Sequence, residues 1–253
     1  MSQLNGQVAL VTGAEVGIGR ATALALAREG ADVAVHYYAD ESGACEVAGA
    51  IAALGRQAAV FHGDLTKSAE VARVVDGAVA RFGRVDILVN NAGGLLGRHA
   101  LVDMTEEFFH AVLDVNVLIT FLCCRAVAPG MIARRHGAIV NLTSLAAHNG
   151  GGPGASIYAA AKAAVLTLTK AYARELAPHG IRVNAVSPGL IGGTPFHNTF
   201  TSPDAFAAAV KTIPLGRAGE PDDVAKVIAF LAGDGAGFVA GETIEINGGM
   251  NMR

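Results

Sequence analysis

The chain has 253 residues, of which 52% are hydrophobic and 16% are charged, and its formal net charge is −3 at pH 7. A sequence of this length and apolar content folds around a large core, which excludes an intrinsically disordered protein. The nearly balanced charge gives no electrostatic basis for binding nucleic acid or an anionic membrane, so we expect neither as a partner.

Features that would direct the chain to a membrane or to secretion are missing from the sequence. No apolar stretch approaches about 18 residues without charged residues or Gly/Pro breaks, and Met1–Gly6 has no basic segment before an apolar run. Three cysteines occur without Cys-x-x-Cys spacing. We therefore expect a cytoplasmic protein that does not span a membrane. The eight histidines lack metal-ligand spacing, so we expect no metal site.

Short apolar runs rich in β-branched residues alternate with longer alanine-rich segments of helical periodicity. The predicted strands are Val8–Val11, Asp32–His36, Ala58–His62, Ile87–Val89, Ala138–Leu142, Arg182–Val186 and Thr243–Ile246. The predicted helices are Ile18–Glu29, Ser42–Leu54, Ser68–Arg81, Glu106–Ala133, Ile157–Ala177 and Pro221–Leu231. This alternation predicts an α/β fold: a single Rossmann-type doubly wound parallel sheet of about seven strands with helices on both faces. We expect one domain over residues 1–253, because no linker or repeat interrupts the pattern.

Residues 188–214 depart from this alternation. They contain several Gly, Pro, Ser and Thr residues and only one short helical piece, Pro203–Lys211. A long irregular segment in a compact domain is usually functional, and this one follows the carboxyl end of a strand, where ligands bind in open α/β sheets. We interpret residues 188–214 as a substrate lid; the alternative is a surface excursion without a function.

Three glycines stand between the first predicted strand and the first predicted helix. Glycine lets the backbone turn tightly and approach a phosphate, and the free N–H groups and dipole of the new helix favour negative charge. The strand–turn–helix context therefore predicts a dinucleotide site, against the alternative of a glycine-rich turn without a ligand. The candidate cofactor contacts in this loop are Gly13, Glu15, Val16, Gly17, Ile18 and Gly19.

Tyr158 and Lys162 are four residues apart, which puts them one helical turn apart on one face. A free tyrosine has a pKa of about 10, and a nearby ammonium group lowers it by favouring the phenolate. Tyr158 can then act as general acid in reduction and as general base in oxidation. Ser144 follows the strand Ala138–Leu142, where its hydroxyl can bond a substrate oxygen that gains charge.

Taken together, these motifs resemble the short-chain dehydrogenase/reductase family. The residues that carry the resemblance are the Gly-x3-Gly-x-Gly loop, Asn90-Asn91-Ala92-Gly93, Ser144 and Tyr158-x3-Lys162, with Asp64, Asn116 and Pro188-Gly189. The similarity runs from Gln7 to Met250. It implies an NAD(P)-dependent oxidoreductase that transfers a hydride directly between the nicotinamide and a ketone or secondary alcohol.

The resemblance also implies roles for single residues. Asn116 would hold the active-site lysine through water in a proton relay, which completes a catalytic set with Ser144, Tyr158 and Lys162. Lys162 would also bind the ribose hydroxyls of the nicotinamide half. The further cofactor contacts would be Asp64 and Leu65 beside the adenine, Asn91, Ala92 and Gly93 along the adenosine and ribose, and Pro188, Gly189 and Ile191 near the nicotinamide.

The residue that ends the second predicted strand bears on the choice of cofactor. An acidic residue there would accept from the ribose 2′-hydroxyl and repel a 2′-phosphate, but the position is Tyr37, which favours NADP. A phosphate also needs Arg or Lys, and Val16 and Tyr37–Ser42 offer none, while Asp40 and Glu41 oppose it. The sequence thus favours NADP, with NAD as the alternative.

The substrate is less well defined, because the fold hosts many alcohols and ketones. Much of the chain resembles the 3-oxoacyl-(acyl carrier protein) reductase branch, with sugar and polyol dehydrogenases as the alternative. Arg135 matches one part of a basic surface for an acidic carrier, and Arg182 is near, but His179 stands where the group often has a second arginine. The predicted lid is polar, which would also suit a sugar or polyol. The family resemblance also implies a homotetramer.

A function of another class would be a dinucleotide-binding sensor that has lost catalysis. Ser144, Tyr158 and Lys162 are all intact, and a sensor has no physical need for the three together. The sequence therefore favours an enzyme.

Overall fold

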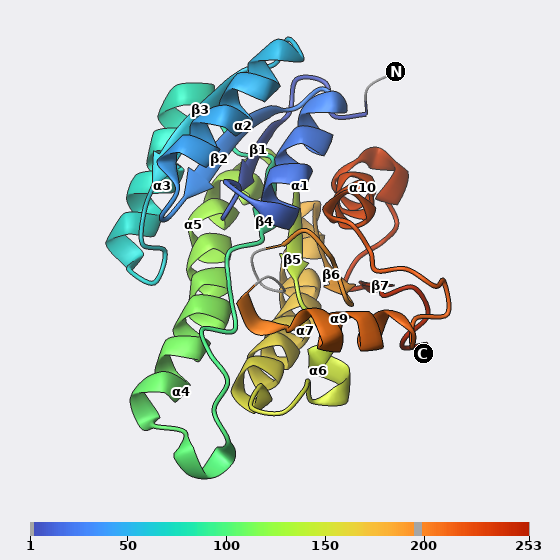
Figure 1. Ribbon diagram of the computed structural model, residues 1–253. Coiled ribbons are helices and arrows are strands. Elements are labelled where there is room, and N and C mark those ends of the chain that lie inside the picture. The colour runs from blue at the N-terminus through green and yellow to red at the C-terminus, as the bar shows by residue number, and fades with distance from the viewer. Residues whose placement is uncertain (1–2, 195–198, 253) are drawn as a thin grey trace.

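The computed structural model describes residues 3–194 and 199–252, and a seven-stranded sheet lies at its centre (Figure 1). All strand pairs are parallel, in the order β3-β2-β1-β4-β5-β6-β7. The strands are β1 Val8–Val11, β2 Asp32–Tyr37, β3 Ala58–His62, β4 Ile87–Asn90, β5 Gly137–Leu142, β6 Ile181–Pro188 and β7 Thr243–Ile246. The strand order reverses direction between β1 and β4, which is where ligands bind in such sheets.

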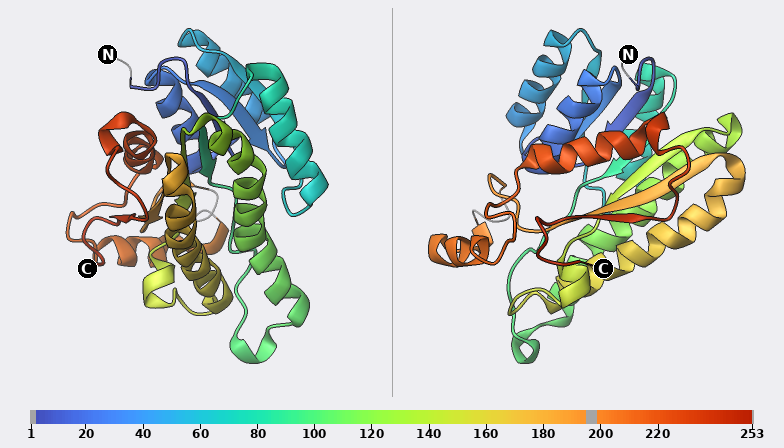
Figure 2. Two further views of the ribbon diagram at one scale, coloured as in Figure 1. Left: turned by 180° about the vertical axis from the view of Figure 1, so that it is seen from behind. Right: turned by 90° about the vertical axis from the view of Figure 1, so that its right-hand side faces the viewer.

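Helices cover both faces of the sheet (Figure 2). One buried cluster packs α1, α2 and α10 on one face, and a second packs α3, α5 and α7 on the other. The α-helices are α1 Gly17–Arg28, α2 Glu41–Ala53, α3 Ser68–Phe82, α4 Glu106–Leu113, α5 Ile119–Arg134, α6 Ala146–Asn149, α7 Ser156–Leu176, α9 Pro203–Val210 and α10 Pro221–Ala232. Short 3-10 turns lie at Leu101–Asp103, Ala177–His179 and Asp234–Ala236. The predicted doubly wound α/β fold is confirmed.

The helix predicted as one segment over Glu106–Ala133 is interrupted. A π-turn, η2 Asp114–Leu118, separates α4 from α5 and contains the buried Asn116. Hydrophobic periodicity does not register such a turn, because the apolar pattern continues across it. π-turns inside α-helices often occur at functional sites, and this one turns Asn116 toward the loop that follows β4.

The continuous helical stretch Glu106–Arg134 is long and apolar enough to cross a membrane by length and composition alone, with a mean hydropathy of 1.9 in its best window. The sequence did not lead us to expect such a segment. Its apolar character has a structural cause, since α5 packs against α3 and against β4 and β5 of the sheet. Buried residues of α5 such as Leu122, Val127 and Met131 belong to the core cluster on that face. A core helix of this kind has the same composition as a membrane-spanning helix.

Candidate active site

The glycine-rich loop between β1 and α1 forms a cradle that side chains would fill. A Cβ atom at Gly19 would collide with the carbonyl oxygen of Gly13 and lie 2.5 Å from Asn91 Nδ2. The start of α1 therefore lies directly against the loop, and its backbone N–H groups are left for a ligand. Such a helix start favours a phosphate, so the residues present fit the pyrophosphate of a dinucleotide.

Side chains from the neighbouring strand brace this loop. Asn91 Nδ2 donates to the carbonyls of Thr12 and Gly13, both at 2.8 Å. The Thr12 hydroxyl donates to Val89 and accepts from the backbone N–H groups of Asn91 and Ala92. The predicted contact residue Asn91 thus uses both its side-chain amide and its backbone N–H to hold the loop.

His36 is a functional residue that the sequence did not single out. Gly13 N donates to His36 Nδ1 at 3.1 Å, and His36 Nε2 lies 3.0 Å from the Gly63 carbonyl. The ring thereby joins the glycine-rich loop to the ends of β2 and β3. Burial lowers the pKa of His36 to about 4, so the ring is neutral and can accept from Gly13. A polar residue inside the apolar strand Asp32–Tyr37 was the signal that could have revealed it.

The His36→Asn variant should lose less stability on acidification than the wild type. The wild-type pKa is about 4 when folded and 6.5 as a free group, so the unfolded chain binds more protons between these values and stability falls as pH falls through them. From pH 7 to pH 5, the wild type should lose about 2 kcal/mol of unfolding free energy through His36. Urea unfolding at both pH values measures it. His62→Asn, an exposed neighbour, should keep the wild-type slope; an unchanged slope in His36→Asn would refute the assignment.

Asp64 and Leu65, the residues predicted beside the adenine, differ in their surroundings: Asp64 is hydrogen-bonded to Thr66, and Leu65 is buried in the core. The Thr66 hydroxyl donates to Asp64 Oδ1 at 2.6 Å, and this hydrogen bond lowers the pKa of the Asp64 carboxyl. Leu65 is 2% exposed and packs in the core cluster beneath the sheet. Only the backbone of Leu65 is therefore available to contact an adenine.

The segment after β6 lies beside the turn that carries Ser144. The Pro188 carbonyl accepts from Leu145 N at 2.9 Å, which ties the end of β6 to that turn. A Cβ atom at Gly189 would lie 2.7 Å from Asn247 Cβ, so the backbone passes close to the chain after β7. Ile191 is buried and bridges to Gly219. The predicted nicotinamide-side residues are thus held at the carboxyl end of the sheet.

Tyr158 and Ser144 meet at this same end of the sheet. Tyr158, in the first turn of α7, is 8% exposed. Burial raises the pKa of the Tyr158 hydroxyl, and its hydrogen bond with Ser144 lowers it in part. The phenol is therefore protonated at neutral pH in the free protein. It can donate a proton to an oxygen that binds beside Ser144.

Lys162 lies one turn further along α7. Its Nζ is 5.8 Å from the centre of the Tyr158 ring and donates to the Leu142 carbonyl at 3.0 Å. The side chain is 5% exposed, and burial lowers the pKa of its ammonium group to about 8. At neutral pH the group is still mostly protonated, so a buried cation stands next to the phenol.

Asn116 and Lys162 converge on Gly93, which follows β4. Asn116 Nδ2 donates to the Gly94 and Val112 carbonyls, both at 2.8 Å, and its Oδ1 accepts from Gly94 N. A Cβ atom at Gly93 would lie 2.7 Å from Asn116 Oδ1 and 3.2 Å from Lys162 Nζ. Asn116 thus holds the loop after β4 and lies near the ammonium group. The four predicted catalytic residues come together in the fold.

The Gly93→Ala variant should lower kcat/KM for carbonyl reduction by about tenfold or more. The new methyl group would displace Asn116 or Lys162, and its backbone has a φ of +156° that other residues rarely adopt. Steady-state kinetics measures the effect. Gly94→Ala is the matched control, because no atom lies within 4 Å of a Cβ atom there. Equal losses in both variants would contradict the assignment.

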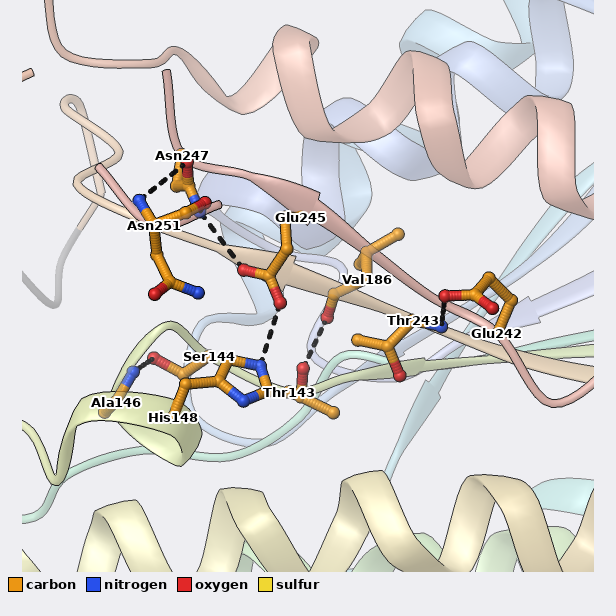
Figure 3. Close-up of polar contacts among 10 residues, drawn as sticks. All are labelled: Thr143, Ser144, Ala146, His148, Val186, Glu242, Thr243, Glu245, Asn247 and Asn251. Atoms are coloured by element: carbon orange, nitrogen blue, oxygen red, sulfur yellow. Dashed lines mark hydrogen bonds and ion pairs between the residues drawn. The ribbon is translucent and has the colours of Figure 1, made fainter. Parts of the chain in front are cut away.

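Figure 3 shows the turn that presents Ser144. Ser144 Oγ accepts from Ala146 N at 3.2 Å, and the Thr143 hydroxyl donates to the Val186 carbonyl at 3.0 Å. From α6, the ring of His148 points toward β7, where its Nε2 lies 2.9 Å from a carboxylate oxygen of Glu245. The turn is therefore fixed to β6 and β7, which positions the Ser144 hydroxyl next to Tyr158.

Comparisons with known proteins agree with this arrangement. A family model described as enoyl-(acyl carrier protein) reductase matches residues 13–251. The 3-oxoacyl-[acyl-carrier-protein] reductase FabG of Staphylococcus epidermidis is 44% identical over 244 residues, 96% of this chain and 98% of the relative. The 3-oxoacyl-[acyl-carrier-protein] reductase of a Synechocystis strain is 42% identical over 253 residues, 100% of both chains.

Solved structures are similar over the same length. The crystal structure of an NADH-dependent reductase, A1-R′, described as responsible for alginate metabolism, is 33% identical, covers 100% of both chains and has a TM-score of 0.91. A nucleotide cradle, a buried tyrosine–lysine pair and full-length relatives thus lead to one assignment. The chain belongs to the short-chain dehydrogenase/reductase family and is a carbonyl reductase that depends on a nicotinamide dinucleotide.

Proposed function

We propose that this enzyme reduces a ketone to a secondary alcohol with Asn116, Ser144, Tyr158 and Lys162 as its catalytic residues, and that a 3-oxoacyl thioester is its first candidate substrate. The observation that carries the proposal is the buried Tyr158 phenol, hydrogen-bonded to Ser144 and adjacent to Lys162, at the carboxyl end of the sheet. The names of the curated relatives support the 3-oxoacyl substrate.

The proposed mechanism assigns one task to each side chain. Ser144 holds the substrate oxygen by a hydrogen bond as charge develops on it. Tyr158 donates its proton to that oxygen, and Lys162 stabilises the phenolate that forms. Asn116, anchored on the loop after β4, keeps Lys162 supplied with a proton through water. When bound, the nicotinamide supplies the hydride.

The dinucleotide would lie across the switch point between β1 and β4. The loop cradle at Gly13, Gly17 and Gly19 supports a pyrophosphate there, and the backbone after β4 supports the adenosine and ribose. The other proposed contacts are Glu15, Val16, Ile18, Tyr37, Asp64, Leu65, Asn91, Ala92, Gly93, Tyr158, Lys162, Pro188, Gly189 and Ile191. Between NADP and NAD, the absence of an acidic residue at Tyr37, the last residue of β2, favours NADP.

An absorbance screen at the nicotinamide band tests the substrate. NADH and NADPH would be offered with 3-oxoacyl thioesters, and NAD and NADP with sugars and polyols. Turnover of a 3-oxoacyl thioester supports the first candidate. Turnover confined to the sugar and polyol arm would replace it with the second.

The second candidate is a sugar or polyol dehydrogenase, and the place of Arg182 favours it over an enzyme that docks an acidic carrier. The Arg182 guanidinium donates to three backbone carbonyls at the end of α10, those of Leu231, Ala232 and Gly233. Arg135 donates to the Pro178 carbonyl at 3.0 Å. Both arginines therefore stabilise the fold, which leaves a weaker basic surface for an acidic carrier than the sequence suggested. The full-length similarity to a reductase described as responsible for the metabolism of alginate, a polysaccharide, supports a substrate derived from a sugar.

The segment from 188 to 214 would act as a lid over this substrate, within one catalytic domain. The α9 helix has no buried residue and stands out from the body of the molecule in the right view of Figure 2. Arg98, in the loop after β4, donates to the Phe200 carbonyl at 3.4 Å and to the Pro153 carbonyl at 2.9 Å. These contacts support a position of the lid over the start of α7. Residues 195–198 of this segment lie outside the described residues.

We also propose a cytoplasmic homotetramer. The side chains of Phe109 on α4 and Phe121 on α5 are 40% and 39% exposed. The strand β7 lies at the edge of the sheet. Such surfaces support contacts between copies of the chain. Sedimentation equilibrium should give a mass of about four chains of 25.7 kDa each. A mass of one chain would refute the tetramer.

A further inference from the structure

The carboxylate of Glu15 contacts the backbone that directly follows β2. Glu15 is the third residue of the glycine-rich loop, and its Oε1 accepts from the backbone N–H of Tyr38 at 3.3 Å. Tyr38 directly follows β2. In doubly wound folds, an acidic residue at the end of this strand bonds the ribose 2′-hydroxyl. Here the carboxylate at the end of β2 comes instead from Glu15, which belongs to the glycine-rich loop.

The second oxygen of this carboxylate has no partner. Glu15 Oε2 is shielded from solvent and makes no hydrogen bond to any described residue. A shielded acceptor without a donor costs free energy, and most such groups in proteins find a partner. Rotation about the last side-chain torsion would present either oxygen to a hydroxyl above the loop. A ribose 2′-hydroxyl supplies the missing donor, whereas a 2′-phosphate supplies negative charge.

Among the described residues around Glu15, the charges nearest to it disfavour a phosphate. Asp40 accepts from Gly43 N at 2.9 Å and caps α2, with Glu41 next to it. Arg20, in the first turns of α1, is already paired with Glu46 at 3.1 Å. A 2′-phosphate would therefore lie near the carboxylates of Glu15, Asp40 and Glu41, and the nearby Arg20 is already paired with Glu46. Like charges placed together cost binding free energy and select against that ligand.

We propose that Glu15 makes this enzyme selective for NAD(H) over NADP(H), by accepting from the ribose 2′-hydroxyl and repelling a 2′-phosphate. The inference rests on the dinucleotide function proposed above and refines it. It reverses the preference drawn from Tyr37, because the acidic residue that the end of β2 lacks is supplied by the loop. The sequence argument considered only the residue that ends β2, so it could not detect a contact between Glu15 and Tyr38, which are 23 positions apart.

Binding of two fragments tests the proposal without relying on turnover. Isothermal titration calorimetry would compare ADP-ribose with 2′-phospho-ADP-ribose on the full-length protein. We expect ADP-ribose to bind at least about tenfold more tightly. Glu15→Gln keeps the shape and removes the charge, so the preference should shrink by about tenfold. Glu175→Gln removes an exposed charge on α7, away from the glycine-rich loop, and should leave the preference unchanged.

The outcomes separate the inference from the function on which it rests. Tighter binding of 2′-phospho-ADP-ribose by the wild type would overturn the inference and leave the dinucleotide function intact. An unchanged preference in Glu15→Gln would have the same consequence, provided that the unfolding temperature of the variant matches that of the wild type. An equal loss of preference in Glu175→Gln would also overturn the role of Glu15, because the overall charge would then be responsible. Binding of neither fragment would overturn the dinucleotide function itself.

Discussion

Replacing Tyr158 by Phe should lower kcat for carbonyl reduction by about 10²- to 10⁴-fold, the usual contribution of a positioned general acid. The ring is buried among apolar residues, so Phe keeps the packing and removes only the hydroxyl. Dinucleotide affinity should fall far less than kcat, because Tyr158 is one of many proposed contacts and the glycine-rich loop and its braces are untouched. Loss of absorbance at the nicotinamide band measures kcat, and calorimetry measures the dissociation constant.

Tyr172→Phe is the matched control for this variant. Tyr172 lies near the other end of the same helix, about four turns beyond Tyr158, where it packs against the core cluster. We expect it to retain wild-type kcat. Equal kcat values for Tyr158→Phe and the wild type on a true substrate would remove Tyr158 from the mechanism.

Replacing Lys162 by Met should lower kcat at least about 100-fold and stabilise the fold at pH 7. The ammonium group is buried, and the partner that the structure gives it is a neutral carbonyl, that of Leu142. A buried charge without a countercharge destabilises a protein, and an apolar side chain of similar size removes that cost. We expect the free energy of unfolding to rise by about 1–3 kcal/mol. Enzymes often retain such a destabilising group for its function.

The stability gain of Lys162→Met should depend on pH in a defined direction. The pKa of Lys162 is about 8 in the folded protein and 10.5 as a free group. Folding therefore opposes protonation of Lys162, and this cost is fully present below about pH 8 and fades as pH rises toward 10.5. The difference in stability between variant and wild type should thus be larger at pH 7 than at pH 10.

Denaturant unfolding at these two pH values measures the difference. Lys170→Met, at an exposed position of the same helix, should show no comparable gain at pH 7. A Lys162→Met variant less stable than the wild type at pH 7 would mean that the ammonium group stabilises the fold, contrary to this interpretation.

The sheet was predictable because each strand is a short apolar run between helical segments. The strands β1, β3 and β7 have the bounds that the sequence predicted, and β6 is longer, at Ile181–Pro188. The π-turn at Asn116 could not be predicted, since local periodicity carries no signal for one extra residue per turn. It depends instead on contacts between Asn116 and the loop after β4.

The predicted catalytic residues meet because the motifs mark the ends of strands and one helix face. The electrostatics were harder to predict. The sequence suggested that Lys162 lowers the pKa of Tyr158, whereas in the free protein burial dominates and raises it. His36 and the contact of Glu15 with Tyr38 were missed for a related reason, because each joins segments more than 20 residues apart. Only the pairing of β1 with β2 brings them together.

The most direct test of the account follows a deuterium label from the nicotinamide to the product. Cofactor labelled at C4 on one face would be mixed with enzyme and a ketone that it reduces, and the alcohol would be analysed by mass spectrometry. Direct hydride transfer at a site that holds the ring in one orientation predicts that one of the two labelled epimers, and not both, delivers deuterium to the carbinol carbon. An alcohol that takes this hydrogen from solvent, or from both epimers equally, would contradict it.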